Sequence, residues 1–204
     1  LGEASSTGDA EGEIVATGHA DIPLHDFQAA RAALTGNIRQ VPPMFSALKH
    51  EGKPLYEYAR QGIVIERKPR DITIYAIDII EYAPPKVMIN VLCSKGTYIR
   101  TLAQDMGETL GVGAHLSGLR RTAVGDLQLS DALTLEQIEA IPEAERAAVL
   151  LPLDALLQDA PALYLSRELA ARFVQGQRLP WGAQQFVSDA TLRIYWQDDA
   201  LPAP

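Results

Sequence analysis

Two neighbouring stretches of alternating, β-branched residues constrain the fold of this chain more than any other feature. The first covers residues 71–82 and the second covers residues 86–94. Such patterns are typical of strands, and the two prolines between them predict a hairpin-like connection. A helical pattern follows over residues 98–110, where the apolar side chains form one stripe. Strand, strand and helix in this order predict a mixed α+β fold.

Shorter elements are expected on both sides of this unit. The patterns predict further helices over 26–35, 54–61, 134–142, 143–151 and 165–175, and further strands over 13–16 and 191–196. Asp26 and Thr97 are the expected N-caps of their helices, and Thr134 with Gln137 forms a capping box. A linker-like stretch at Asp159 divides the chain into a domain over residues 1–160 and a short module over 161–204, which is too small for an independent core.

The charge of the chain is unevenly distributed. The net charge is −8, yet residues 39–70 hold seven basic and three acidic side chains, and residues 95–121 hold four basic and two acidic ones. Because electrostatic fields are screened within about 8–10 Å, an acidic protein can still bind a polyanion at a local basic face. Solvated surface charge is the alternative explanation.

The sequence argues against several classes of protein. No apolar run is long enough to span a membrane, the N-terminus does not resemble a signal peptide, and we expect a cytoplasmic protein. Cys93 is the single cysteine, so a disulfide framework is excluded, and its strand context predicts a buried, inert thiol. The four histidines lack metal-ligand spacing, and no phosphate-binding glycine motif or Gly-x-Ser-x-Gly motif occurs.

Arg100 is the residue that points most clearly to chemistry. It lies in the first turn of the helix predicted over 98–110, where the helix dipole disfavours a cation by about 0.3–1 kcal/mol. A residue that breaks a local rule in this way often has a functional reason. We therefore expect Arg100 to meet an anion, either a carboxylate or a phosphate; an ordinary surface arginine is the alternative.

Two further segments combine basic residues with features of RNA-binding surfaces. In residues 40–60, Lys49, Lys53 and Arg60 alternate with Phe45, Tyr56 and Tyr58. Cations suit phosphates and aromatic rings stack on unpaired bases, although a proline-stiffened loop beside an aromatic-packed helix explains the same composition. Arg120 and Arg121 follow Leu119 and are candidates for phosphate contacts or for a solvated strand edge.

Five motifs together resemble the bacterial TruB-type tRNA pseudouridine synthase family. They occur in the order and spacing of the family, and the resemblance is strong over residues 1–125, looser over 126–157, and limited over 161–204 to the start of a PUA domain. In this sequence the motifs are Leu1-Gly2 with Thr7–Gly12, Val41–Lys49, Gly52–Gly62, Cys93–Arg100, and Gly113–Leu116 with Leu119–Arg121.

The resemblance implies a fold and a reaction. The fold is an α+β catalytic core with a mixed sheet and flanking helices, followed by a partial PUA-like RNA-binding module. The reaction isomerises uridine 55 in the T arm of tRNA to pseudouridine without metal or organic cofactor, on a base that leaves its stack. The expected partner is tRNA, which the protein would bind as a monomer. No association with a membrane is expected.

The resemblance also implies roles for individual residues. Tyr98 lines the uridine pocket, Leu119 contacts the base as part of the pocket wall, and Arg100 pairs with the catalytic aspartate. Asp9 belongs to a loop near the active site. Together with the basic segments described above, this gives Asp9, Lys49, Lys53, Arg60, Arg120 and Arg121 as candidate RNA-contacting residues.

The sequence departs from the family pattern in ways that affect the expected activity. The motif that carries the catalytic aspartate, Gly-His-x-Gly-x-Leu-Asp-Pro, lies upstream of Leu1 in the family and is absent here, and Ser6 stands where the family has an acidic residue. We expect an internal part of a longer synthase that is inactive alone and leaves Arg100 without a carboxylate partner. The alternative is a non-catalytic RNA-binding or RNA-chaperone relative.

Overall fold

The computed structural model describes residues 1–179 and 191–197. Contacts divide the chain into one unit over Leu1–Arg120 and another over Arg121–Pro204. The linker expected at residues 159–161 therefore lies inside the second unit, and part of the module expected over 161–204, residues 180–190 and 198–204, lies outside the described residues.

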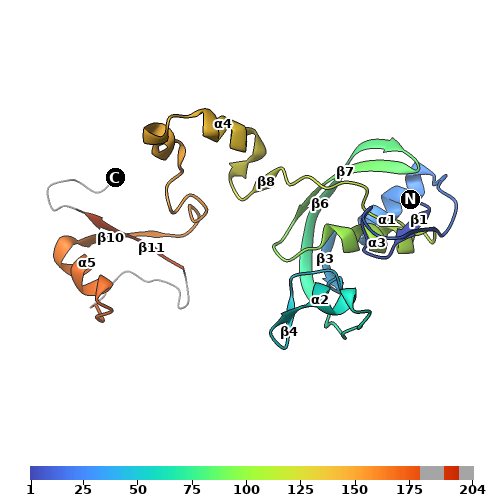
Figure 1. Cartoon of the computed structure of the whole chain (residues 1–204), viewed down its shortest axis with the longest axis horizontal. Coiled ribbons are helices and arrows are strands. Elements are labelled where there is room, and N and C mark those ends of the chain that lie inside the picture. The colour runs from blue at the N-terminus through green and yellow to red at the C-terminus, as the bar shows by residue number, and fades with distance from the viewer. Residues whose placement is uncertain (180–190, 198–204) are drawn as a thin grey trace. The chain divides into compact units, whose positions relative to one another are not determined.

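A three-stranded antiparallel sheet organises the first unit. Its order is β3 (Gly36–Gln40), β6 (Arg70–Ala83) and β7 (Lys86–Cys93), so the long strand β6 lies in the middle (Figure 1). Ala83 pairs with Lys86 across the two prolines, which confirms the predicted strands and their hairpin connection.

Helices α1 (Leu24–Ala33) and α3 (Ile99–Thr109) supply the other half of the core. The helical stripe predicted around residues 98–110 is confirmed, because its apolar residues are buried against the sheet. The core cluster contains Ile22, Phe27, Ala30, Ile72, Ile74, Ile77, Leu102, Met106 and Val112. Burial of these side chains removes apolar surface from water and is the main stabilisation of the unit.

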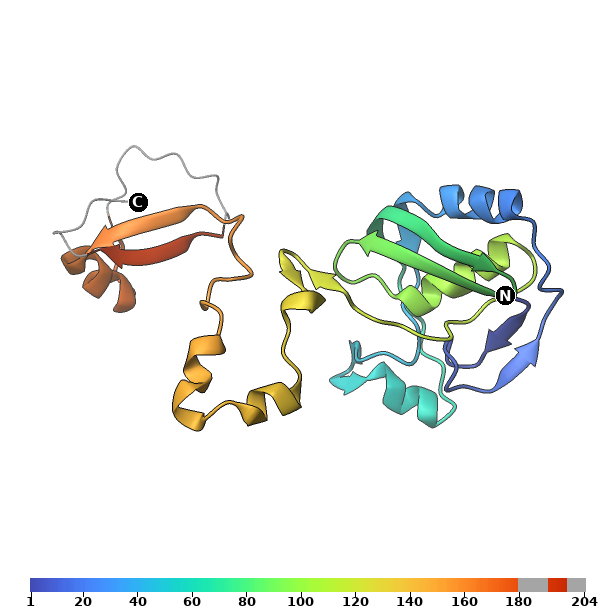
Figure 2. The same cartoon turned by 90° about the horizontal axis from the view of Figure 1, so that it is seen from above.

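Two small hairpins complete the first unit. One is β1 (Glu3–Ser5) with β2 (Ile14–Ala16), and the other is β4 (Lys49–His50) with β5 (Lys53–Pro54), which leads directly into α2 (Leu55–Arg60). Both hairpins are antiparallel (Figure 2).

Two predicted helix caps are wrong. Helix α1 begins at Leu24 after Pro23, so Asp26 lies in its first turn, where its negative charge complements the helix dipole. Helix α3 begins at Ile99 with Tyr98 in the N-cap position, and the Thr97 hydroxyl instead donates to the carbonyl of Ser94, 2.9 Å away. In both cases the N-cap residue makes no side-chain cap hydrogen bond.

The second unit consists of short elements, listed here in chain order: β8 (Ala123–Val124), β9 (Leu127–Gln128), η1 (Leu129–Asp131), α4 (Leu135–Ala140), η2 (Glu143–Val149), β10 (Ala162–Ser166), α5 (Arg167–Val174) and β11 (Arg193–Gln197). The capping box of Thr134 and Gln137 is confirmed, with both reciprocal bonds present. The segment expected as a helix over 143–151 is a 3₁₀-helix.

Strands β10 and β11 run parallel, and α5 packs beside them around Leu163, Leu165 and Leu179. The segment that precedes β10 is attached to this sheet by Arg193 of β11. The Arg193 guanidinium donates to the Asp154 carboxylate at 3.1 Å and to the Gln158 side-chain oxygen at 2.8 Å.

Among the described residues, no helix has the length and apolar character needed to cross a membrane.

Candidate active site

Arg100 is placed by a tight connection between the sheet and helix α3. After β7 ends, Ser94 remains tied to the central strand: its amide donates to the Thr73 carbonyl at 2.8 Å, and its hydroxyl accepts from the Thr73 amide at 3.0 Å. Gly96 then adopts a φ of 82°, a conformation that favours glycine. The turn delivers Arg100 as the second residue of α3.

The anion that Arg100 meets is the carboxylate of Asp9. Nη1 of Arg100 lies 3.0 Å from Oδ2 of Asp9, and about three quarters of each side chain is shielded from solvent. The same Nη1 donates to the carbonyl of Thr7 at 3.3 Å, and Nη2 donates to the carbonyl of Phe45 at 2.6 Å. The expectation that Arg100 lacks a carboxylate partner is therefore wrong, because a residue 91 positions away supplies one.

The loop around Asp9 holds its carboxylate in an ionised form. Oδ1 accepts the Thr7 hydroxyl at 2.6 Å and the Glu11 amide at 3.2 Å. The Thr7 hydrogen bond is the largest cause that lowers the pKa of Asp9; the Glu11 amide and the Arg100 guanidinium also lower that pKa, against partial desolvation. Asp9 therefore stays ionised beside Arg100 at neutral pH.

Backbone pairing fixes the Asp9 loop to a distant segment. Asp9 and Leu116 form an isolated parallel bridge. The Ala10 amide donates to the Leu116 carbonyl, and the Leu116 amide donates to the Gly8 carbonyl, both at 3.0 Å. The loop, the segment around Leu116 and the start of α3 are thus held in one arrangement.

The guanidinium of Arg100 retains donors for a second anion. A guanidinium carries five N–H donors in a planar fork. The hydrogen bonds made by Arg100 to described residues start from Nη1 and Nη2 and use three of these donors. Two donors, one on Nε and one on Nη2, are left over. The site is chemically able to bind a further carboxylate or phosphate while Asp9 remains in place.

Tyr98 is positioned by a residue to which the sequence analysis gave no role. The Gln40 side chain accepts from the Tyr98 amide at 2.8 Å and donates to the Tyr98 carbonyl at 3.2 Å. Gln40 is 2% exposed and ends strand β3. These two bonds fix the backbone of Tyr98, a half-buried residue that lies two positions before Arg100 in the chain.

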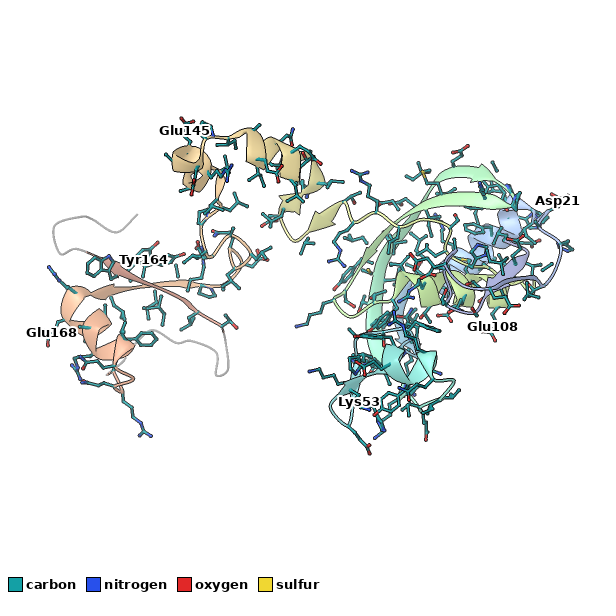
Figure 3. All side chains as sticks on the ribbon, in the orientation of Figure 1. Asp21, Lys53, Glu108, Glu145, Tyr164 and Glu168 are labelled. Carbon is teal, nitrogen blue, oxygen red and sulfur yellow. The ribbon has the colours of Figure 1, made fainter. Side chains whose placement is uncertain are left out.

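The candidate RNA-contacting cations of residues 40–60 gather on one small structural piece. Lys49 and Lys53 lie on the β4–β5 hairpin, and Arg60 ends the helix that follows it; all three are exposed. Figure 3 shows the side chain of Lys53 at this hairpin. The Arg60 guanidinium lies 5.2 Å from the centre of the Tyr56 ring. The hairpin and helix α2 together thus carry cations and aromatic rings on one short stretch of backbone.

Comparison with known proteins identifies the family. Residues 1–99 match the family described as "TruB family pseudouridylate synthase (N terminal domain)". Residues 100–158 match the one described as "tRNA pseudouridylate synthase B C-terminal domain". This chain belongs to the TruB family. The boundary between the two matched models falls at Arg100, so the Arg100–Asp9 pair joins the two family segments.

Curated relatives of the TruB family match nearly all of the chain. A tRNA pseudouridine synthase B of Neisseria meningitidis serogroup A is 57% identical over 198 residues, covering 97% of this chain and 64% of the relative. That of Cupriavidus metallidurans is 55% identical, covering 98% of this chain and 66% of the relative. The chain thus spans a little under two thirds of the length of these relatives.

Solved structures share the fold. A crystal structure of a Cbf5-Nop10-Gar1 complex aligns with a TM-score of 0.60 at 27% identity, covering 78% of this chain and 46% of that chain. A structure of an H/ACA RNP bound to a substrate RNA containing 2'-deoxyuridine aligns with a TM-score of 0.62 at 22% identity, covering 88% of this chain and 53% of that chain.

The remaining candidates from the TruB resemblance lie on the surface. Leu119 is 65% exposed, three residues after the Leu116 bridge to Asp9. Arg120 and Arg121 are also exposed and follow it directly. The structure therefore pairs Arg100 directly with Asp9, and Tyr98 precedes Arg100 by two residues and is held by Gln40. Leu119, Arg120 and Arg121 are connected to the Asp9–Arg100 pair only along the chain, through the Leu116 bridge.

Two hydroxyls near Arg100 were not predicted by the sequence. Ser46 follows the Phe45 carbonyl that Arg100 binds, and Thr101 follows Arg100 itself; both residues are buried, and their hydroxyl oxygens lack a hydrogen-bond partner among the described residues. The sequence does not indicate that a serine or threonine at these positions is buried, since their burial results from tertiary packing.

The described residues contain no group of three or more His, Cys, Asp or Glu side chains that could hold a metal ion. Cys93, expected to be buried, is partly exposed at the end of β7.

Proposed function

We propose that the intact protein is a tRNA pseudouridine synthase that isomerises uridine 55 in the T arm. The observation that carries the proposal is the Arg100 site. Its guanidinium is fixed by Asp9, Thr7 and Phe45, and two of its donors bond no residue that the structure describes. Membership of the TruB family and relatives called tRNA pseudouridine synthase B support the reaction.

In this proposal Arg100 holds a second carboxylate, that of a catalytic aspartate supplied by residues upstream of Leu1. An arginine fork keeps a carboxylate ionised and orients it, which a nucleophile at the uracil ring or ribose requires. Asp9 fixes the opposite edge of the fork, so the guanidinium does not need to reorient when the second anion arrives. Tyr98 and Leu119 form part of the pocket for the uridine.

The reaction is an isomerisation. The bond between ribose and N1 of uracil breaks, the base turns, and a bond forms between the same ribose carbon and C5, whose proton is released while N1 gains one. The atoms balance without a second substrate, and we propose that no cofactor takes part.

The RNA would be bound by exposed cations. We propose that Lys49, Lys53, Arg60, Arg120 and Arg121 contact phosphates, and that residues 161–204 begin a PUA-like RNA-binding module. We also propose that the protein acts as a monomer in the cytoplasm, where it meets its tRNA.

The direct test uses the intact protein and an unmodified T-arm stem-loop labelled with tritium at C5 of the uridines. Formation of pseudouridine releases that tritium, and a stem-loop with cytidine at position 55 is the matched control. Release from the first RNA and none from the second is the expected result. Tight binding without release would instead show the non-catalytic RNA-binding relative.

A further inference from the structure

Helix α3, which carries Arg100, begins without a local cap. The start of a helix leaves backbone N–H groups without partners, and a capping box satisfies two of them with the side chains of the N-cap and of the third helical residue. Helix α4 has such a box, formed by Thr134 and Gln137. In α3 the N-cap is Tyr98, whose side chain makes no cap hydrogen bond, and the third helical residue is Thr101. The start of α3 is therefore fixed by another part of the chain.

Gln40 supplies the missing bond from the end of strand β3. Its Oε1 accepts from the Tyr98 amide at 2.8 Å, as the third helical residue does in a capping box. Its Nε2 donates at 3.2 Å to the Tyr98 carbonyl, which also accepts the Leu102 amide in the first hydrogen bond of the helix. These two bonds fix the orientation of the Gln40 amide and the point at which α3 begins.

The same stretch of chain also holds the guanidinium of Arg100. Arg100 is the second residue of α3, and its Nη2 donates to the carbonyl of Phe45 at 2.6 Å. Phe45 follows Gln40 by five residues, and the two prolines between them restrict the backbone. Residues 40–45 thus contact α3 both at the amide where it begins and at the fork of Arg100. A shift of the helix start away from Gln40 would move the Arg100 backbone relative to Phe45.

We propose that Gln40 is a positioning residue of the reaction, which holds Arg100 where its fork orients the second carboxylate. Gln40 does not act on the substrate itself, because its side chain is buried and both of its bonds go to the backbone of Tyr98. A displacement of about 1 Å at a catalytic group can cost about a hundredfold in rate, so such a contact can control turnover. The inference rests on the proposed function, in which Arg100 orients a catalytic aspartate.

Single-turnover tritium release at saturating T-arm stem-loop, with the intact protein, tests the proposal. Gln40→Met keeps the length of the side chain and loses both bonds, whereas Gln40→Asn keeps the amide and is one methylene too short. We expect both variants to lower the rate by about tenfold to a hundredfold, with the dissociation constant of the stem-loop changed by less than about twofold. A loss confined to RNA affinity overturns the proposal.

Tyr82→Phe is the matched control. It also removes a long-range hydrogen bond from a side chain to the backbone, because the Tyr82 hydroxyl donates to the carbonyl of Ile22. Its rate should stay close to that of the unchanged protein. All variants are compared at a temperature at which circular dichroism shows them folded; if Gln40→Met does not fold, Gln40→Asn carries the comparison.

Two further readouts separate positioning from a general loss of stability. By NMR, the Tyr98 amide should exchange at least about tenfold faster in Gln40→Met and at an unchanged rate in Tyr82→Phe. The combined variant Gln40→Met with Arg100→Lys should be little slower than Arg100→Lys alone, because a residue that acts through Arg100 then has little left to position. An unchanged Tyr98 amide, or a combined loss equal to the product of the two separate losses, overturns the proposal.

Failure of the inference and failure of the proposed function give different results. If the unchanged protein releases no tritium, the proposed function is wrong and the inference falls with it. If the unchanged protein releases tritium and the Gln40 variants match the rate of Tyr82→Phe, only the inference is wrong.

Discussion

Arg100 lies in the first turn of α3, and its guanidinium binds the carboxylate of Asp9. Its position in a first helical turn predicts an anionic partner, because the dipole alone disfavours a cation there. The structure confirms a carboxylate. The identity of that carboxylate was not predictable, since Asp9 lies 91 positions before Arg100 and its loop is positioned by a backbone bridge to Leu116.

At the same scale, Asp9 should contribute to stability in a pH-dependent way. Its pKa is lowered in the folded state, chiefly by the Thr7 hydrogen bond, so its contribution is complete above the unfolded pKa of about 3.9 and is lost as the pH falls through the folded value. We expect Asp9→Asn to reduce the free energy of unfolding at pH 7 by about 1–2 kcal/mol. Urea unfolding of both proteins measures this.

The difference in the free energy of unfolding between Asp9→Asn and the unchanged protein should become smaller as the pH falls below about 4. Asp71→Asn is the matched control, because Asp71 forms a solvent-exposed pair with Arg39 at 3.8 Å and its substitution should change the free energy of unfolding little. A difference that stays constant from pH 7 to pH 3 would contradict the ionised state of Asp9.

At the scale of elements, the long patterns were predictable, whereas the short elements were predictable only in part: β2, α2, α4 and β11 were expected, and β3 and β10 were not. The strands β6 and β7 and helix α3 carry enough alternating or helical repeats to be recognised. Strand β3 has five residues and exists because it pairs with β6 more than thirty residues later. No local pattern encodes such a pairing, and the same holds for β10.

The N-cap residues of helices α1 and α3 were mispredicted because they, too, depend on tertiary packing. Asp26 and Thr97 are good capping residues by type, yet the chain enters each helix from a direction set by packing. Pro23 and Tyr98 therefore take the N-cap positions. The capping box at Thr134 was correct because both of its partners are local.

The β4–β5 hairpin and α2 carry the clearest prediction at this scale. Reversing the charge of Lys49, Lys53 and Arg60 in the intact protein should weaken binding of a T-arm stem-loop. Each lost phosphate contact should also lower the slope of log affinity against log salt by about one. Titrations at several salt concentrations measure both quantities.

Reversal of three exposed acidic residues, Glu139, Glu143 and Glu145, provides the matched control, and should not produce the same loss. An unchanged salt slope in the hairpin variant would remove these cations from the RNA interface.

At the scale of the whole molecule, the chain contains the arginine side of the proposed catalytic pair. We expect residues 1–204 alone to form no pseudouridine, even at high concentration, because the free donors of Arg100 then face no nucleophilic carboxylate. The tritium-release assay on a T-arm stem-loop measures this, with the intact protein as the positive control. Turnover by residues 1–204 would show that the nucleophile lies within them.

The most direct test of the account is the single-turnover rate of Arg100→Lys in the intact protein at saturating stem-loop. Lysine keeps the charge but cannot hold Asp9 and a second carboxylate on one planar fork. We predict normal folding, nearly unchanged RNA binding, and a rate reduced by about a hundredfold or more. If Arg100 only contacts phosphate, lysine should replace it with little loss; a rate close to that of the unchanged protein would contradict the central claim.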